Sequence, residues 1–313
     1  MMGRRVVFMG TPDFAVPCLQ AIVNAGYEVC GVVSQPDRPK GRGRKLCPSP
    51  VKEAALKLDL PVVTVERVKD PAFLVQLQEW QSDVAVVVAF GQILPESVLN
   101  MPKFGCVNVH ASLLPAYRGA APIHRVILDG MTKTGVTTMQ MDKGMDTGDI
   151  LLSDAVEIPP DMTMGELHDR LSAKGAVLIV KTLEQLFDGL IQPIAQDSGK
   201  ASYAPMLNRG IERIDWSRPA QELHNQARGL NPWPGAYYIC DNITMKLWRS
   251  RVKPADGYLQ IPGRIRSVSA EGLVVETGRD LLEMLEVQPE CKRRMGARDC
   301  ACGYCMTPGT ILE

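Results

Sequence analysis

The sequence predicts an α/β fold with a parallel-rich sheet, followed by a small β-barrel. Short apolar runs alternate with amphipathic segments as far as residue 189. These runs are rich in β-branched residues, which suits strands that helices bury on both faces. The remaining residues form short strand-like runs between Gly, Asp and Pro turns. With 313 residues, of which 45% are hydrophobic, the chain is long enough for two domains.

The expected elements of the first domain follow from its periodicity. The strand candidates are residues 5–9, 28–33, 60–65, 83–90 and 105–110. Helical spacing of apolar residues predicts helices at 13–25, 50–58, 71–80 and 121–128. Two later strands, GVTTMQMD and GDILLSDAVEI, flank a polar turn. A long helix is expected from Thr163 to Phe187, since Thr163 and Glu166 form a capping-box pattern at its start.

The apolar period ends after Asp188, where Gly, Pro, Ser and polar residues follow. We therefore expect a first domain at residues 1–189, a linker at 190–206 and a second domain at 207–313. The strand candidates of the second domain are 235–241, 245–252, 263–270, 272–278 and 281–287. Their even spacing by turn residues is typical of a small barrel or sandwich.

Composition limits the possible partners and compartments. The formal net charge is zero, so any contact with nucleic acid must come from a local basic patch. Nine scattered cysteines without a recognisable secretory segment favour a reducing compartment, and we expect a cytoplasmic protein. No run approaches the ~18 to 20 apolar residues of a membrane span, so we expect no membrane association.

The stretch CVNVHASLLPAYRG, residues 106–119, places two polar side chains in an apolar strand. Asn108 and His110 are two positions apart, so they point to the same face. The strand ends at this point, and ligands bind at the carboxyl ends of strands in open α/β sheets. The pair is therefore a candidate site. The alternative is that Asn108 and His110 only satisfy nearby loop carbonyls.

The turn MDKGMDTGDI, residues 141–150, brings three aspartates and two glycines between two strands. A calcium loop beginning at Asp142 would need Gly and Glu where Thr147 and Ser153 stand, so we expect no metal here. An aspartate beside a histidine orients the imidazole and favours its protonated form. Asp146 is the aspartate that we expect to pair with His110.

These residues lie in motifs that resemble the folate-dependent formyltransferases, and specifically the branch that acts on initiator methionyl-tRNA. The matching stretches are Asn108-x-His110, SLLP, YRGAAPI, Asp146-Thr147-Gly148-Asp149, MGTPDFAVPCL, SQPDRPKGRGRKLCPSPVK, AFGQILP and ARGLNPWPGAY. They span nearly the whole chain in matching order. The resemblance implies a Rossmann-like formyltransferase domain and an OB-like barrel. It also implies transfer of a formyl group from 10-formyltetrahydrofolate to the methionine amino group of initiator methionyl-tRNA, for translation initiation.

The resemblance also implies residue roles. Asn108 and His110 would stabilise the oxyanion that forms on the formyl group, and Asp146 would orient His110 and accept the proton of the amine. Residues that would bind the folate are Ser112, Leu113, Leu114, Pro115, Phe90, Gly91, Ile93 and Leu94. No metal is implied.

The basic run DRPKGRGRK is the expected tRNA contact. It contains Arg38, Lys40, Arg42, Arg44 and Lys45. The sequence alone suggests a flexible, solvated loop, and its glycines allow the cations to reach phosphates. In the resembled family this loop enters the acceptor end of the tRNA. The second domain, with its basic and aromatic residues, is expected to contribute to tRNA binding. We expect a monomer.

Several alternatives stay open at this point. Cys106 or Ser112 is a conceivable nucleophile. A zinc site is conceivable at the four C-terminal thiols of Cys291, Cys300, Cys302 and Cys305, although their spacing lacks paired knuckles. The same triad would also serve another amine acceptor or the hydrolysis of 10-formyltetrahydrofolate. A nucleotide-binding oxidoreductase is disfavoured, because G-x-G-x-x-G is absent at Gly10. A non-catalytic RNA-binding module is the last alternative.

Overall fold

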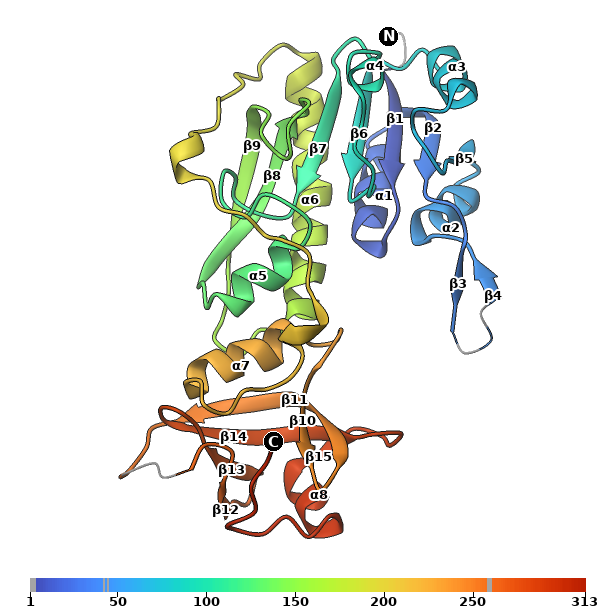
Figure 1. The fold of residues 1–313 in the computed structure, drawn as a ribbon. Coiled ribbons are helices and arrows are strands. Elements are labelled where there is room, and N and C mark those ends of the chain that lie inside the picture. The colour runs from blue at the N-terminus through green and yellow to red at the C-terminus, as the bar shows by residue number, and fades with distance from the viewer. Residues whose placement is uncertain (1–3, 42, 44, 258–260) are drawn as a thin grey trace. The chain divides into compact units, whose positions relative to one another are not determined.

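The computed structural model of the chain describes residues 4–41, 43, 45–257 and 261–313 (Figure 1). Two compact units are present. The first comprises the chain as far as Pro122, with Thr134–Val156 and His168–Ala204, and the second comprises Ile123–Lys133, Glu157–Leu167 and Pro205–Glu313. Most of the expected linker therefore packs within the first unit. The expectation that residues 1–189 and 207–313 are separate domains stays a prediction.

The first unit is built on a seven-stranded sheet with the order β5-β2-β1-β6-β7-β8-β9. The strands are β1 (Arg5–Gly10), β2 (Glu28–Ser34), β5 (Val62–Thr64), β6 (Val84–Val88), β7 (Cys106–His110), β8 (Lys133–Gln140) and β9 (Ile150–Glu157). The pairings from β5 to β7 are parallel, whereas β8 runs antiparallel to β7. The parallel-rich sheet is confirmed, with this one reversed strand added.

The expected helices are also present. They are α1 (Val16–Asn24), α2 (Pro50–Lys57), α3 (Pro71–Glu79), α5 (Pro122–Leu128) and α6 (Met164–Phe187), with a short α4 (Glu96–Leu99) that was not expected. Short 3₁₀ helices lie at Asp13–Ala15, Ser198–Lys200 and Arg209–Ile211. The capping box is confirmed, because Glu166 Oε2 accepts from Thr163 N at 2.8 Å and Thr163 Oγ1 accepts from Glu166 N at 3.3 Å.

Helix α6 and the core on the other face of the sheet fix the orientation of β7. A Cβ at Gly175 of α6 would lie 3.1 Å from Val109 Cγ1, so α6 packs closely on the valine face. Cys106 belongs instead to the core that contains Phe73 of α3 and Val98 of α4. Because side chains alternate along a strand, Asn108 and His110 share the face of Cys106.

The sequence suggested that the basic run is a flexible loop, but only part of it is irregular. Its flanks pair as the antiparallel strands β3 (Arg38–Lys40) and β4 (Lys45–Cys47), which project from the first unit as a hairpin (Figure 1). Lys40 lies directly opposite Lys45 in this pairing.

The second unit contains an antiparallel sheet with the order β10-β11-β14-β13-β12 and with β15 paired to β14. The strands are β10 (Ala236–Cys240), β11 (Ile243–Lys253), β12 (Ile265–Val268), β13 (Leu273–Glu276), β14 (Leu281–Pro289) and β15 (Met295–Gly296). The sheet is barrel-like but not closed, since no pairing joins β10 to β12 among the residues described. Backbone bonds from Ile239 to Glu313 and from Ile265 to Thr310, each 2.8 Å long, place the last residues along both edge strands.

Two further helices of the second unit were not expected, α7 (Ala220–Gly229) and α8 (Ala297–Gly303). Helix α7 lies against β11 in Figure 1 and buries polar side chains. His224 Nε2 donates to the Pro160 carbonyl at 3.1 Å, and Arg228 Nη1 donates to the Met162 carbonyl at 3.1 Å. These bonds tie the segment Glu157–Leu167 into the second unit. In the part of the chain that is described, no helix is long and apolar enough to cross a membrane.

Candidate active site

Strand β7 carries Asn108 and His110 at the carboxyl end of the parallel sheet. Asn108 is partly exposed, whereas only 7% of His110 is exposed. The register pairs His110 with Thr137 of β8, which places both strands beside the same site. The structure therefore brings the amide and the imidazole to one place, and their catalytic roles stay predictions.

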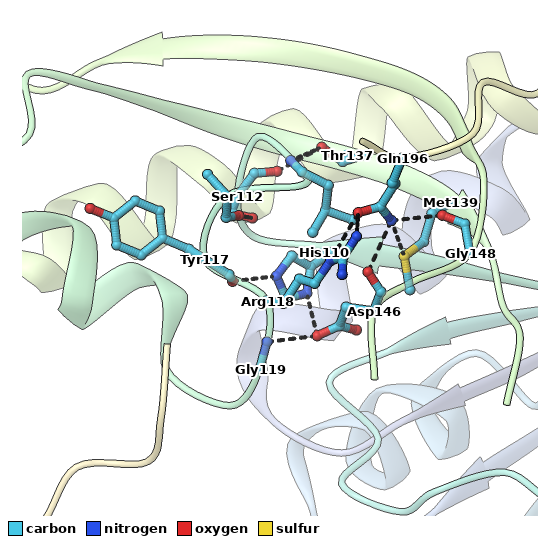
Figure 2. Close-up of polar contacts among 12 residues, drawn as sticks. His110, Ser112, Tyr117, Arg118, Gly119, Thr137, Met139, Asp146, Gly148 and Gln196 are labelled. Carbon is cyan, nitrogen blue, oxygen red and sulfur yellow. Dashed lines mark hydrogen bonds and ion pairs between the residues drawn. The ribbon is translucent and has the colours of Figure 1, made fainter. Parts of the chain in front are cut away.

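The ring of His110 is fixed through one nitrogen (Figure 2). Nε2 lies 3.0 Å from the carbonyl oxygen of Tyr117. Because a carbonyl only accepts, Nε2 carries a proton and donates it. Nδ1 lies 3.7 Å from Asp146 Oδ2, which is within reach of an ion pair but longer than a hydrogen bond. Nδ1 is consequently the ring nitrogen that a ligand can engage.

Asp146 reaches His110 from the turn between β8 and β9. Its Oδ2 also accepts from the backbone N–H of Gly119 at 2.8 Å, which fixes the carboxylate from a second direction. The φ of Asp146 is +55°, a left-handed conformation that few residues other than glycine adopt. Such strained residues are concentrated at functional sites, where the surrounding structure holds them in place.

The turn itself is shaped by short-range bonds. Asp142 Oδ1 accepts from Thr147 Oγ1 at 2.7 Å and from Gly144 N at 2.9 Å. A Cβ at Gly148 would lie 1.8 Å from the Gln140 carbonyl oxygen, so only glycine fits at this close approach. Within the described ranges, no three His, Cys, Asp or Glu side chains gather as a set of metal ligands.

The segment Ser112–Pro115 lies directly after β7 and is held against β8. Thr137 Oγ1 donates to the Ser112 carbonyl at 2.7 Å and accepts from Leu114 N at 3.2 Å. Ser112 is fully buried, and its hydroxyl donates to the Ala116 carbonyl at 2.6 Å. The folate contacts expected of Ser112, Leu113, Leu114 and Pro115 stay a prediction.

The second predicted folate segment alternates between core and surface. Phe90 and Leu94 are buried, and the Phe90 carbonyl accepts from Thr11 Oγ1 at 3.1 Å. Gly91 is exposed, and 87% of Ile93 is exposed. The folate contacts expected of Phe90, Gly91, Ile93 and Leu94 stay a prediction.

Three of the five predicted tRNA-binding residues are described, and all three are exposed. Arg38 and Lys40 lie on β3 and Lys45 begins β4. The other two, Arg42 and Arg44, lie outside the described residues. An exposed hairpin with three cations on its strands offers phosphate-binding groups.

Sequence reasoning missed Arg118 and Gln196. Arg118 is 3% exposed and donates from Nε and Nη2 to Gln196 Oε1, at 3.1 and 2.8 Å. Gln196 Nε2 in turn donates to the carbonyls of Asp146 and Gly148, at 2.9 and 2.7 Å. Arg118 lies within the motif YRGAAPI, which was a usable signal. Gln196 lies in the expected linker, where no periodicity marks it.

The cysteines do not provide an activated thiol at the site. Burial raises the pKa of Cys106 to about 12, and its Sγ faces the carbonyls of Val98 and Leu99. The thiol is therefore protonated at neutral pH, which argues against the nucleophile alternative. In the tail, Cys300 is buried and the pKa of its thiol is raised by burial to about 11, whereas Cys302 and Cys305 are exposed.

Family models match both parts of the chain. The model described as formyl transferase matches residues 4–183, and the model described as formyl transferase, C-terminal domain, matches residues 207–305. A solved N-formyltransferase from Helicobacter canadensis has a TM-score of 0.68 and 20% identity, and the match covers 90% of this chain and 99% of that one. This last likeness shows that the fold is shared.

Curated relatives match over nearly the full length. The methionyl-tRNA formyltransferase of Moorella thermoacetica is 50% identical over 308 residues, which are 98% of this chain and 99% of the relative. That of Bacillus licheniformis is 48% identical over 309 residues, which are 98% of each chain. The chain belongs to the formyl transferase family and, within it, to the methionyl-tRNA formyltransferases.

Proposed function

We propose that this protein transfers the formyl group of 10-formyltetrahydrofolate to the α-amino group of methionine on initiator methionyl-tRNA. The high identity to methionyl-tRNA formyltransferases over the full length supports this reaction and its acceptor. The observation that carries it in the structure is the pair His110 and Asp146, with Nδ1 3.7 Å from Oδ2 beside the partly exposed Asn108. The product is the formylated tRNA used in translation initiation.

The amine is the nucleophile. An α-amino group has an ordinary pKa of about 7.7 to 8.0, so a useful neutral fraction is present near pH 7. Its lone pair forms the new N–C bond to the formyl carbon, and the formyl oxygen becomes an oxyanion. The tetrahedral intermediate collapses when the bond from carbon to N10 of the folate breaks and N10 takes up a proton. The attacking nitrogen loses one proton.

Three side chains have roles in these steps. The Asn108 amide donates to the oxyanion, and so does Nδ1 of protonated His110, since Nε2 is occupied by the Tyr117 carbonyl. Asp146 stabilises the protonated ring and accepts the proton from the amine, directly or through a water. One carboxylate oxygen is held by Gly119 N, which leaves the other for this proton.

The substrates would approach from two directions. The folate would lie along Leu113–Pro115 and across Gly91 and Ile93, so that its formyl group meets Asn108 and His110. The phosphates of the tRNA would meet Arg38, Lys40 and Lys45, with Arg42 and Arg44 as further predicted contacts. We place the protein in the cytoplasm as a monomer, which light scattering and cell fractionation would check.

The decisive assay follows the release of tetrahydrofolate. The protein is mixed with 10-formyltetrahydrofolate and, separately, with initiator methionyl-tRNA, uncharged tRNA, glycinamide ribonucleotide or buffer alone. We expect release only with the charged tRNA, together with formylmethionine recovered from that tRNA. Release with glycinamide ribonucleotide would identify another amine acceptor, and release in buffer alone would identify a hydrolase. Either outcome would overturn the proposal.

A further inference from the structure

The bonds between Arg118 and Gln196 define the orientation of the Gln196 amide (Figure 2). A guanidinium only donates, so the atom that faces Arg118 must be Oε1. The carbonyls of Asp146 and Gly148 only accept, so the atom that faces them must be Nε2. Both sides of the amide therefore require the same orientation. Arg118 is 3% exposed, so its geometry is held by packing.

The two carbonyls that Gln196 binds belong to the strained turn of the site. Asp146 has a φ of +55°, and Gln196 holds both its carbonyl and that of Gly148, two residues later. Asp tolerates the left-handed region better than most residues other than glycine, and the two hydrogen bonds from Gln196 add support to this conformation. The backbone at Asp146 sets the direction of the carboxylate that faces His110.

Arg118 also lies between the two residues that hold the catalytic groups through their backbones. The Tyr117 carbonyl accepts from His110 Nε2 at 3.0 Å, and Gly119 N donates to Asp146 Oδ2 at 2.8 Å. Hydrogen bonds and the chain itself therefore connect His110 through Tyr117, Arg118 and Gln196 to Asp146, and the 3.7 Å contact between Asp146 and His110 completes the path. A shift of Gln196 could move Asp146 directly, or His110 through Arg118 and Tyr117, and either movement would change the distance between Asp146 and His110.

We infer that Gln196, oriented by Arg118, is a positioning residue that sets the distance and angle between Asp146 and His110. The inference rests on the proposed function, since it assigns Gln196 a part in that reaction. Gln196 touches neither substrate in this assignment. A misplacement of about 1 Å at a catalytic group costs up to ~10² in rate, so the effect of losing Gln196 is measurable.

The test compares Q196M with a matched variant, Q140M. Gln140 Nε2 also donates to two main-chain carbonyls of the first unit, those of Phe104 and Cys106, at 3.2 and 3.3 Å. Methionine preserves the length of either side chain and removes its hydrogen bonds. We expect Q196M to lower kcat roughly 10- to 100-fold with KM for both substrates changed by less than about threefold. Q140M should keep kcat within about twofold at a comparable melting temperature.

A second substitution at the same position separates positioning from general loss of structure. Q196E provides a second variant that stays folded, since its carboxylate still accepts from Arg118. It loses the donor to the two carbonyls, so its kcat should fall as in Q196M. Equal kcat for Q196M and Q140M, or a wild-type kcat for Q196E, would overturn the inference.

One readout does not depend on the reaction. The chain has four histidines, so the imidazole ¹⁵N signals of His110 can be assigned by substitution. We expect these signals to shift in Q196M and Q196E and to stay unchanged in Q140M. Unchanged signals in all three variants would contradict the inference. A wild-type protein that transfers no formyl group would instead contradict the proposed function, and the two failures are thus distinguishable.

Discussion

Asn108 stands next to His110 on the strand but differs from it in what fixes it. The His110 ring has a backbone acceptor at Tyr117 and a carboxylate at Asp146, whereas the Asn108 amide lies partly exposed at the edge of the site. In the proposed mechanism the Asn108 amide faces the oxyanion, so its contribution would be greatest when charge develops on the substrate.

For Asn108→Ala we expect kcat to fall about 10²- to 10³-fold, since one oxyanion donor is lost, while KM for the folate changes by less than about threefold. Steady-state kinetics with saturating charged tRNA measure this. Circular dichroism of the variant controls for folding. A kcat within about threefold of the wild type would remove Asn108 from the mechanism.

His224 is a buried histidine of the second unit. Burial lowers the pKa of His224 below its ordinary value, and nearby Arg228 lowers it further, although the Pro160 carbonyl opposes the shift. The neutral ring is fully bonded, because Nε2 donates to Pro160 and Nδ1 accepts from Ser250 Oγ at 3.1 Å. Asp161 Oδ1 lies 3.5 Å from Nε2 but is well exposed.

The lowered pKa of His224 predicts a pH dependence of stability. The folded state binds this proton less readily than the unfolded state, so stability present above about pH 6.5 is lost as the pH falls from there toward the folded pKa. In H224Q the amide reproduces the Nε2 donor without titrating. We expect the unfolding free energy, measured by urea denaturation between about pH 7.5 and pH 5.5, to fall less in H224Q than in the wild type. Parallel curves for the two proteins would show that His224 is not responsible.

The hairpin of β3 and β4 places two positive charges opposite each other. Lys40 and Lys45 are directly opposite each other, and like charges in such a pair destabilise a sheet. An anion that lay over both side chains would relieve this repulsion, and a phosphate backbone would supply such an anion.

Lys45→Gln should therefore separate hairpin stability from tRNA binding. We expect an unchanged or slightly higher melting temperature, weaker binding of the tRNA, and a plot of log K against log salt whose slope is smaller by about one. Fluorescence anisotropy across a salt series measures the slope. Lys57→Gln, at an exposed position of α2, is the control. The same loss of slope in both variants would mean that the hairpin has no special role.

Elements with local signals could be predicted, and elements held by distant partners could not. The five parallel strands and the capping box at Thr163 follow from apolar runs and from spacing within a few residues. Helix α7 escaped because it buries polar side chains beside its apolar ones, and their long-range bonds reach residues 13 to 66 positions away. Gln196 escaped for the same reason, since its partners at the site are 48 to 78 positions away. The hairpin strands are three residues long and carry charges. They were not predicted because they show no alternation of apolar and polar residues.

At the scale of the whole molecule, the segment Glu157–Leu167 belongs to the second unit although the chain then returns to the first. A fragment of residues 205–313 would lack the carbonyls that receive His224 and Arg228. A buried polar group without its partner costs about 1 to 3 kcal/mol, which is large beside a typical stability of about 5 to 15 kcal/mol.

We expect this fragment, made alone, to be several kcal/mol less stable than the corresponding unit in the intact chain. Urea denaturation followed by tryptophan fluorescence measures this, because Trp216, Trp233 and Trp248 all lie within the fragment. Addition of a peptide of residues 157–167 provides the control and should restore part of the loss. A fragment as stable as the intact unit would show that these bonds contribute little.

The shared segments also bear on how such proteins can be recombined. The second unit draws on three stretches of the gene, and two of them, which encode Ile123–Lys133 and Glu157–Leu167, interrupt the coding region of the first unit. A crossover that exchanged only the region after residue 205 would combine segments of the second unit from two parents, and these segments would not have been selected to pack together. A viable hybrid must therefore carry all three stretches from one parent, so substitutions in them are inherited as a block.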